Sequence, residues 1–128
     1  MIVLDTHAWV WWATSSPSLS ARATRAIRAD QTLYVSAISC WEVAMLVAKG
    51  RLVFDRDVEL WLDLALKLPG IELVPISPTI AVRSSRLEER FLGDPADCII
   101  VATALEYGCA IVSKDERIRR YRRVRAIW

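Results

Sequence analysis

Short apolar segments alternate with helix-forming segments along nearly the whole chain of 128 residues. We expect strands at 2–5, 33–36, 71–76, 110–113 and 124–128. We expect helices at 7–14, 21–29, 40–49, 57–68, 78–90 and 95–107. Strands separated by helices form parallel sheets that are covered on both faces. The alternation therefore predicts an α/β fold, and we expect one domain that spans residues 1–128.

Size and composition exclude several classes of protein. Apolar residues make up 54% of the chain and charged residues 25%, which is typical of a globular domain. No apolar run approaches the ~20 residues that a membrane-spanning helix needs. The opening segment lacks a basic region and carries Asp5 within its apolar run, so we expect a cytoplasmic protein rather than a secretory leader.

The cysteines and the histidine narrow the chemistry. Cys40, Cys98 and Cys109 are odd in number and show no paired spacing, so we expect small buried side chains in a reducing compartment. His7 is the only histidine, which leaves too few ligands for zinc and no pair of histidines for acid–base catalysis. A chain of this kind that cleaves phosphodiesters must use carboxylates and a metal ion.

Four acidic residues stand where predicted strands end or predicted helices begin: Asp5, Glu42, Asp97 and Asp115. Ligands of open α/β sheets bind beyond the carboxyl ends of the strands, so these side chains are expected to meet in one pocket. Oxygen ligands suit Mg²⁺ or Mn²⁺. Two like charges 4 Å apart repel by roughly 4 kcal/mol at an effective dielectric near 20, so raised carboxylate pKa values are expected.

Each acid also has a local alternative role. Asp5 can cap the helix after it, and Ser39 with Glu42 forms a capping-box pattern with Ser39 at the N-cap. Asp94 before Pro95 is an N-cap pattern, and it leaves Asp97 where the helix dipole favours a negative charge. Asp115 can merely begin a turn. None of these local roles explains why acids recur at several junctions of one small sheet.

Four segments together resemble the PIN-domain ribonucleases, specifically the VapC-type toxins of prokaryotic toxin–antitoxin pairs. The segments are LDTHAWVWW, SCWEVAMLVAKGRL, GDPADCIIVATAL and IVSKDERI, and they span nearly the whole chain in the family's order. The resemblance implies a PIN-like α/β/α sandwich with a central, mostly parallel sheet of four to five short strands. It also implies a type II toxin that acts on RNA, a VapB-type antitoxin as partner and a homodimer.

The same resemblance assigns roles to residues. Asp5, Glu42, Asp97 and Asp115 would form the acidic metal site and carry the catalysis. Asp94 would be an additional acid, and Thr6 and Ser113 would be supporting hydroxyls. Cys98 departs from the arginine that many relatives carry after the second aspartate, but no carboxylate is lost.

A Mg²⁺ or Mn²⁺ ion in such a pocket would lower the pKa of a bound water and neutralise charge on the phosphate. Hydrolysis would then leave a 5′-phosphate and a 3′-hydroxyl, whereas a 2′,3′-cyclic phosphate would contradict this scheme. The sequence leaves open whether one or two ions bind.

Basic and aromatic residues indicate where partners bind. Six arginines fall between positions 117 and 125, and we expect Arg117, Arg119 and Arg120 to contact substrate phosphates. A second arginine series at 22, 25 and 28 is more simply a solvated helix face. The six tryptophans are expected mainly in the core, and some can line a groove for the antitoxin.

Three other functions remain open from the sequence. A Mg²⁺-dependent phosphatase with an aspartate nucleophile would share the aspartate at a strand end, but the haloacid-dehalogenase-like version needs a second aspartate at position 7, which is His7. A non-catalytic RNA-binding module would be expected to lack one or more of the acids. A structure-specific DNA nuclease usually carries extra acids and extra elements.

Overall fold

A computed structural model describes residues 1–88, 91 and 93–128. The strands are β1 (Ile2–Leu4), β2 (Leu33–Ser36), β3 (Ile71–Val74), β4 (Ala110–Val112) and β5 (Ala126–Ile127). The helices are α1 (Thr6–Ala13), α2 (Ala21–Ala29), α3 (Ala37–Ala48), α4 (Val58–Leu66), α5 (Pro78–Ser85), α6 (Pro95–Tyr107) and α7 (Glu116–Arg120).

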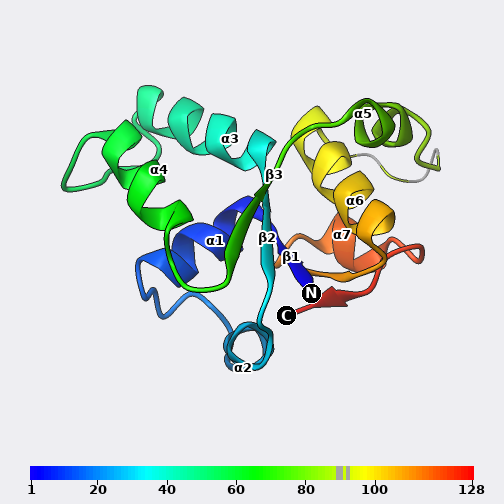
Figure 1. Cartoon of the computed structure of the whole chain (residues 1–128), viewed down its shortest axis with the longest axis horizontal. Helices are drawn as coiled ribbons and strands as arrows, with labels where there is room; N and C mark the ends of the chain where they lie inside the picture. Colours follow the sequence, from blue (N-terminus) through cyan, green and yellow to red (C-terminus); the bar gives the residue numbers. More distant parts are fainter. Residues whose placement is uncertain (89–90, 92) are drawn as a thin grey trace.

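The five strands form one parallel sheet in the order β3-β2-β1-β4-β5. Figure 1 shows this sheet between two groups of helices, with α1, α3 and α4 on one side and α5, α6 and α7 on the other. The predicted α/β/α sandwich with a parallel sheet is therefore confirmed. β1 lies at its centre, and Leu4 is in register with Val35 and Val112, so three strands end together at one edge.

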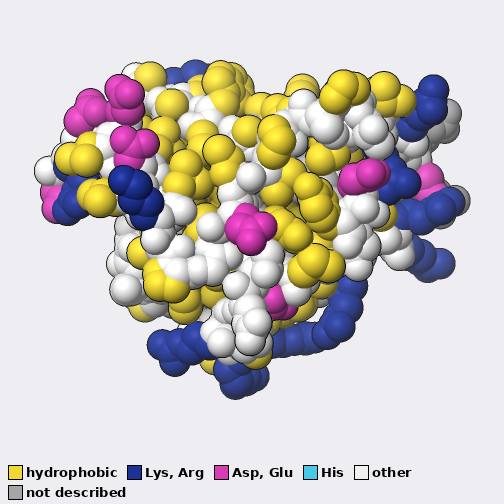
Figure 2. All heavy atoms as spheres, in the orientation of Figure 1, with side chains coloured by type: hydrophobic (Ala, Val, Ile, Leu, Met, Phe, Trp, Pro, Cys, Tyr) yellow, Lys and Arg dark blue, Asp and Glu magenta, His cyan; other side chains and the backbone are white. Residues whose placement is uncertain are grey.

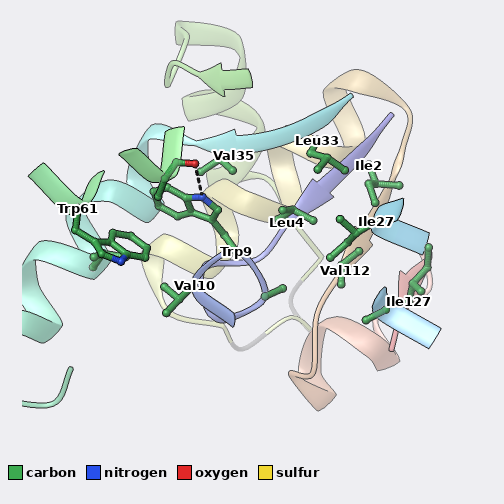
Figure 3. Close-up of a cluster of buried hydrophobic side chains, with 14 residues drawn as sticks. Ile2, Leu4, Trp9, Val10, Ile27, Leu33, Val35, Trp61, Val112 and Ile127 are labelled. Carbon is green, nitrogen blue, oxygen red and sulfur yellow. Dashed lines mark hydrogen bonds between the residues drawn. The ribbon is translucent and has the colours of Figure 1, made fainter. Parts of the chain in front are cut away.

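Alternate residues of β1, β2 and β4 supply two hydrophobic clusters, one on each face of the sheet. Leu4, Val35 and Val112 point into a cluster with Trp9 and Trp61, which is drawn in Figure 3. The intervening residues face the opposite cluster, where Val3 and Ile111 pack with Ile100 and Ile118. A strand with apolar residues on both faces must be buried on both, which explains the short unbroken apolar runs in the sequence.

The expected core role of tryptophan holds for part of the set. Trp9 is fully buried, and its indole N–H donates to the carbonyl of Ala65 at 3.4 Å. Trp61 packs tilted against Trp9 and stacks on Phe54. Trp41 is 57% exposed and belongs to the surface.

Several predicted boundaries are wrong. α3 begins at Ala37, and its N-cap is Ser36, whose hydroxyl accepts from the N–H of Ile38. The capping box of Ser39 and Glu42 is therefore absent, because β2 runs into α3 without a loop. α5 ends at Ser85, and the predicted end at position 90 lies outside the described residues. The helix α7 was not predicted.

Other caps agree with expectation. Ser20 and Ser77 accept from the N–H groups of Ala23 and Ile80, as N-caps do. Gly50 lies just after α3 with a φ of 69°, a conformation that glycine adopts without strain. Within the described ranges, the structure contains no helix of the length and apolar character needed to span a bilayer.

Candidate active site

The four predicted acids line one pocket of about 220 Å³ at the carboxyl edge of the sheet. Asp5 follows β1, Asp115 lies beyond β4, Asp97 comes from the first turn of α6 and Glu42 from α3. Thr6, His7, Val10, Trp11, Leu46 and Leu52 complete the lining. Because neighbouring parallel strands end at the same edge, residues far apart in sequence meet here.

Asp5 is held on both of its oxygens. It caps α1 by accepting from the N–H of Thr6 at 2.8 Å through Oδ1. Its Oδ2 accepts from the buried hydroxyl of Ser113 at 2.6 Å. Ser113 in turn accepts from the N–H of Asp115 at 3.0 Å, so one hydroxyl ties the ends of β1 and β4 together. The expected local role of Asp5 as a cap and its place in the pocket therefore coexist.

Glu42 approaches the pocket from the second turn of α3, because the helix begins earlier than predicted. Its Oε1 accepts from the Thr6 hydroxyl at 2.5 Å. The same hydroxyl lies 2.8 Å from the hydroxyl of Ser39, which is fully buried. Ser39 thus supports the pocket instead of capping the helix, and sequence reasoning assigned it the wrong role.

Asp94 and Asp97 divide two tasks between them. Asp94 is the N-cap of α6, and its Oδ1 accepts from the N–H of Asp97 at 2.8 Å. Asp94 is exposed and does not line the pocket, whereas Asp97 is only 9% exposed and does. Their order in the DPAD segment turns the second carboxylate inward.

Asp115 begins α7 as its N-cap. Its Oδ1 accepts from the N–H of Arg117 at 2.7 Å and from that of Ile118 at 3.4 Å. The guanidinium of Arg117 reaches back to Oδ2 of Asp115 at 3.2 Å and to Oδ2 of Asp97 at 3.3 Å. Arg117 therefore bridges two of the four acids.

The electrostatics of the pocket follow from these contacts. Burial, followed by the charges of Asp5, Asp94, Asp115 and Glu42, raises the pKa of Asp97 to about 7. Burial also raises the pKa of Glu42, against the hydrogen bond from Thr6. For Asp115 burial acts upward as well, but the hydrogen bonds from Arg117 outweigh it and lower its pKa. Crowded carboxylates with raised pKa values are the pattern of a site that binds a cation.

The oxygen atoms that line the pocket are of the type that binds hard divalent ions. Carboxylate and hydroxyl oxygens surround the pocket, and these are the ligands that Mg²⁺ and Mn²⁺ prefer. Across the residues that the structure describes, no group of three or more His, Cys, Asp and Glu side chains is already arranged to hold a metal ion. An ion shared by several acids requires side chains to turn from their present partners, Thr6 and Arg117 among them.

His7 is a contributor that sequence reasoning could not place. Its Nε2 accepts from the N–H of Lys114 at 2.9 Å, and its Nδ1 lies 3.6 Å from Oδ2 of Asp5. The ring also packs against Trp11 and Trp128. The imidazole thus links the loop after β4 to the start of α1, a contact that no pattern in the sequence indicates.

The other two predicted substrate arginines lie away from the pocket. Arg120 pairs with Glu116 at 3.4 Å on the exposed surface of α7, and Arg119 is exposed on the same helix. A larger hollow, of about 860 Å³, lies beside α5 and α6. Arginines line it at Arg83, Arg86 and Arg123. Glu88 is its one carboxylate among the described lining residues, so we place the chemistry in the smaller acidic pocket.

Comparison with known proteins gives a family and a close relative. A family model described as PIN domain matches residues 2–124. The chain is 36% identical over 126 residues to "Ribonuclease VapC22" of Mycobacterium tuberculosis (strain ATCC 25618 / H37Rv). That alignment covers 98% of this chain and 95% of the relative.

Solved structures share the fold at lower identity. VapBC2 from Rickettsia felis, bound to a DNA fragment from their promoter, has a TM-score of 0.72 at 18% identity and covers 98% of this chain and 97% of that one. DNA-bound VapBC from Salmonella typhimurium has a TM-score of 0.70 at 14% identity, covering 98% and 95%. At these identities the structural similarity shows that the fold is shared.

Proposed function

The chain belongs to the PIN-domain family and to its VapC-type branch, and on that premise we propose that it is the RNA-cleaving toxin of a VapBC pair. We further propose that it hydrolyses phosphodiester bonds with a divalent metal ion. The observation that carries the metal-dependent chemistry is the convergence of four carboxylates from four elements on one pocket. Gathering four carboxyl groups in one pocket costs free energy, and a bound cation would offset that cost.

We assign the ion to Asp5, Glu42, Asp97 and Asp115. When bound there, Mg²⁺ or Mn²⁺ supplies a more acidic water and neutralises charge on the scissile phosphate. The buried hydroxyl of Ser113 keeps Asp5 oriented, since it donates to Oδ2. Supporting contacts of this kind are what hold metal ligands in a productive geometry.

The residues of the second layer have distinct tasks. Thr6 orients Glu42 by donating to Oε1, and Asp94 fixes the first turn of α6 that presents Asp97. The charge of Asp94 also raises the pKa of both Glu42 and Asp97, which increases the pull of the pocket on a cation.

The bond that breaks determines the products. Water attacks phosphorus, the bond from phosphorus to the 3′-oxygen breaks, and that oxygen takes up a proton. The result is a 5′-phosphate and a 3′-hydroxyl, with no cyclic phosphate, because the 2′-hydroxyl does not take part.

Arginines of α7 would hold the rest of the RNA. Arg117 reaches two acids of the pocket, and Arg119 and Arg120 are exposed further along the same helix. Phosphate contacts of this type position a strand without reading its bases. Affinity for RNA is then expected to fall steeply with salt.

Exposed apolar side chains support binding to protein partners, which we infer to be a VapB-type antitoxin and a second copy of the chain. Figure 2 shows hydrophobic side chains gathered over α3, β3 and α6. Large exposed hydrophobic side chains include Trp41 on α3 and Leu73 on β3, with Leu60 and Leu64 on α4 and Val82 on α5. Patches of this kind commonly mark protein interfaces. Light scattering of the chain alone measures its mass in solution. We expect the mass of two chains, and the mass of one chain would refute the dimer.

The test of the function is cleavage of RNA by the purified chain with Mn²⁺, followed by sequencing of the new 5′ ends. Asp97→Asn is the inactivating variant. Asp63→Asn is the matched control, because Asp63 is exposed on α4 away from the pocket. We expect 5′-phosphate ends from the wild type and the control, and none from Asp97→Asn.

Other outcomes separate the alternatives. Equal cleavage by Asp97→Asn, or cyclic phosphate ends, overturns the proposed chemistry. Binding of RNA without cleavage under any metal condition favours the non-catalytic module. Hydrolysis of a phosphate monoester in place of RNA favours the phosphatase.

A further inference from the structure

Arg117 is placed differently from every other arginine that the structure describes on α7. Its guanidinium Nη2 lies 3.3 Å from Oδ2 of Asp97 and 3.2 Å from Oδ2 of Asp115. Its own N–H donates to Asp115 Oδ1, so the backbone holds the residue beside the pocket. Arg120 instead pairs with a surface glutamate, which shows that position on the helix, rather than charge alone, directs Arg117 inward.

The two oxygens that Arg117 contacts belong to residues that we assign as metal ligands. A guanidinium that bridges two carboxylates offsets part of their mutual repulsion. A divalent ion would offset more, and it would bind the same Oδ2 atoms that the guanidinium contacts, where the two positive charges repel. Ion and guanidinium are therefore competitors for the same atoms.

The guanidinium of Arg117 is the most exposed member of this bridge. Its side chain is 52% exposed, and exposed ion pairs contribute little to stability. Asp97, by contrast, has a side chain only 12% exposed and stays in the pocket. Displacement of the bridge by an ion would therefore move the guanidinium and leave the carboxylate of Asp97 in place.

We propose that Arg117 is a built-in counter-cation of the metal-free pocket, which a divalent ion must displace from Asp97 and Asp115. This inference rests on the proposed metal site. It gives Arg117 a second task besides the phosphate contact that we assign to it with Arg119 and Arg120. It also means that the chain binds its ion more weakly than the four carboxylates alone would.

Direct titration of Mn²⁺ into the metal-free chain, without RNA, tests the competition. The variants are Arg117→Gln and, as the matched control, Arg119→Gln, which removes the same charge two residues further along α7. We expect Arg117→Gln to bind Mn²⁺ about three- to tenfold more tightly than the control, the range that loss of one or two partly exposed ion pairs allows. Arg117→Lys should lie between the wild type and Arg117→Gln, because a lysine keeps the charge and loses the fork.

Thermal melting gives a second readout that does not depend on activity. In EDTA, Arg117→Gln should melt at a lower temperature than Arg119→Gln, since the carboxylates then lack their counter-cation. In saturating Mn²⁺ the two variants should melt alike, because the bound ion then neutralises the carboxylates in both.

Two kinds of failure are distinguishable. If Arg117→Gln binds Mn²⁺ as the control does, or more weakly, Arg117 is not a competitor and the inference is wrong while the metal site stands. If the wild type binds no Mn²⁺, or if Asp97→Asn binds it as well as the wild type, the proposed metal site itself is wrong.

Discussion

Two aspartates of the pocket, Asp97 on the α6 side and Asp115 on the α7 side, have pKa values shifted in opposite directions. On the α6 side, burial and neighbouring charges raise the pKa of Asp97 to about 7. On the α7 side, hydrogen bonds from Arg117 bring the pKa of Asp115 below its usual value despite burial. Both residues are aspartates at the start of a helix, and both line the same cavity.

Position within the first turn explains the difference. Asp115 is an N-cap, and its Oδ1 accepts from the N–H groups of Arg117 and Ile118. Asp97 is three residues beyond the N-cap Asp94, and its own N–H is used to complete that cap. The carboxylate of Asp115 accepts from backbone N–H groups, which favour its charged form, whereas Asp97 gives its backbone N–H to the cap and its buried carboxyl group faces the other acids.

The largest effect is expected from Asp97→Asn, which removes the charge on the side with the raised pKa. Loss of a ligand should reduce RNA cleavage by more than about a hundredfold, because loss of second-layer partners alone costs 10–100-fold. Initial rates over a range of Mn²⁺ concentrations measure this. Activity restored by excess Mn²⁺ would mean that Asp97 tunes affinity without being essential.

The pH dependence of stability separates the two sides. Asp97 has a folded pKa of about 7, above its unfolded value of 3.8, so the folded chain holds this proton more tightly. Stability of the metal-free chain should therefore fall as pH rises from about 4 to about 7, by about 4 kcal/mol at most. Asp115, with a lowered pKa, loses its contribution only as pH falls below about 4.

Denaturant unfolding in EDTA at a series of pH values measures both windows. In Asp97→Asn the decline between pH 4 and 7 should flatten, although Glu42 contributes in the same direction. A decline of the same size in wild type and Asp97→Asn contradicts the assignment of the raised pKa to Asp97.

Ser113→Ala tests the link between the strand ends. The fully buried hydroxyl donates to Asp5 and accepts from the N–H of Asp115, so its loss leaves a buried carboxylate oxygen and a partly buried N–H without this partner. We expect a loss of about 1–3 kcal/mol in the free energy of unfolding. Ser85→Ala, on the exposed surface of α5, is the control. Equal effects from both substitutions would show that the hydroxyl of Ser113 contributes no more to the free energy of unfolding than an exposed serine does.

The smallest effect is expected from Arg120→Gln. Its pair with Glu116 is an exposed contact between residues four apart on α7, which is typically worth about 0.3–0.5 kcal/mol. Unfolding of this variant at low and high salt is the measurement. A loss above about 1 kcal/mol would show that this surface pair is coupled to the pocket.

Much of the fold was predictable because local signals and the fold agree. The apolar strand runs, the caps at Ser20, Ser77 and Asp94, and the glycine after α3 all act within a few residues. Ser39 was assigned wrongly because two serines three residues apart both suit an N-cap. The direct junction of β2 and α3 decides in favour of Ser36, which no local pattern reveals.

The pocket was predictable in membership and less so in detail. Acids at strand–helix junctions identify Asp5, Glu42, Asp97 and Asp115, since the carboxyl edge of a parallel sheet brings such junctions together. The contact of His7 with the N–H of Lys114 joins residues 107 positions apart and leaves no trace in the sequence. Arg117 likewise stood among six similar arginines until the geometry of α7 separated it.

An anomalous difference map from crystals grown with Mn²⁺ tests the central claim most directly, because it locates the ion without reference to activity. We expect a strong peak in the acidic pocket, at coordination distance from carboxylate oxygens of Asp5, Asp97 and at least one of Glu42 and Asp115. A pocket without a peak at saturating Mn²⁺, or a peak that touches a single carboxylate, would contradict a shared metal site.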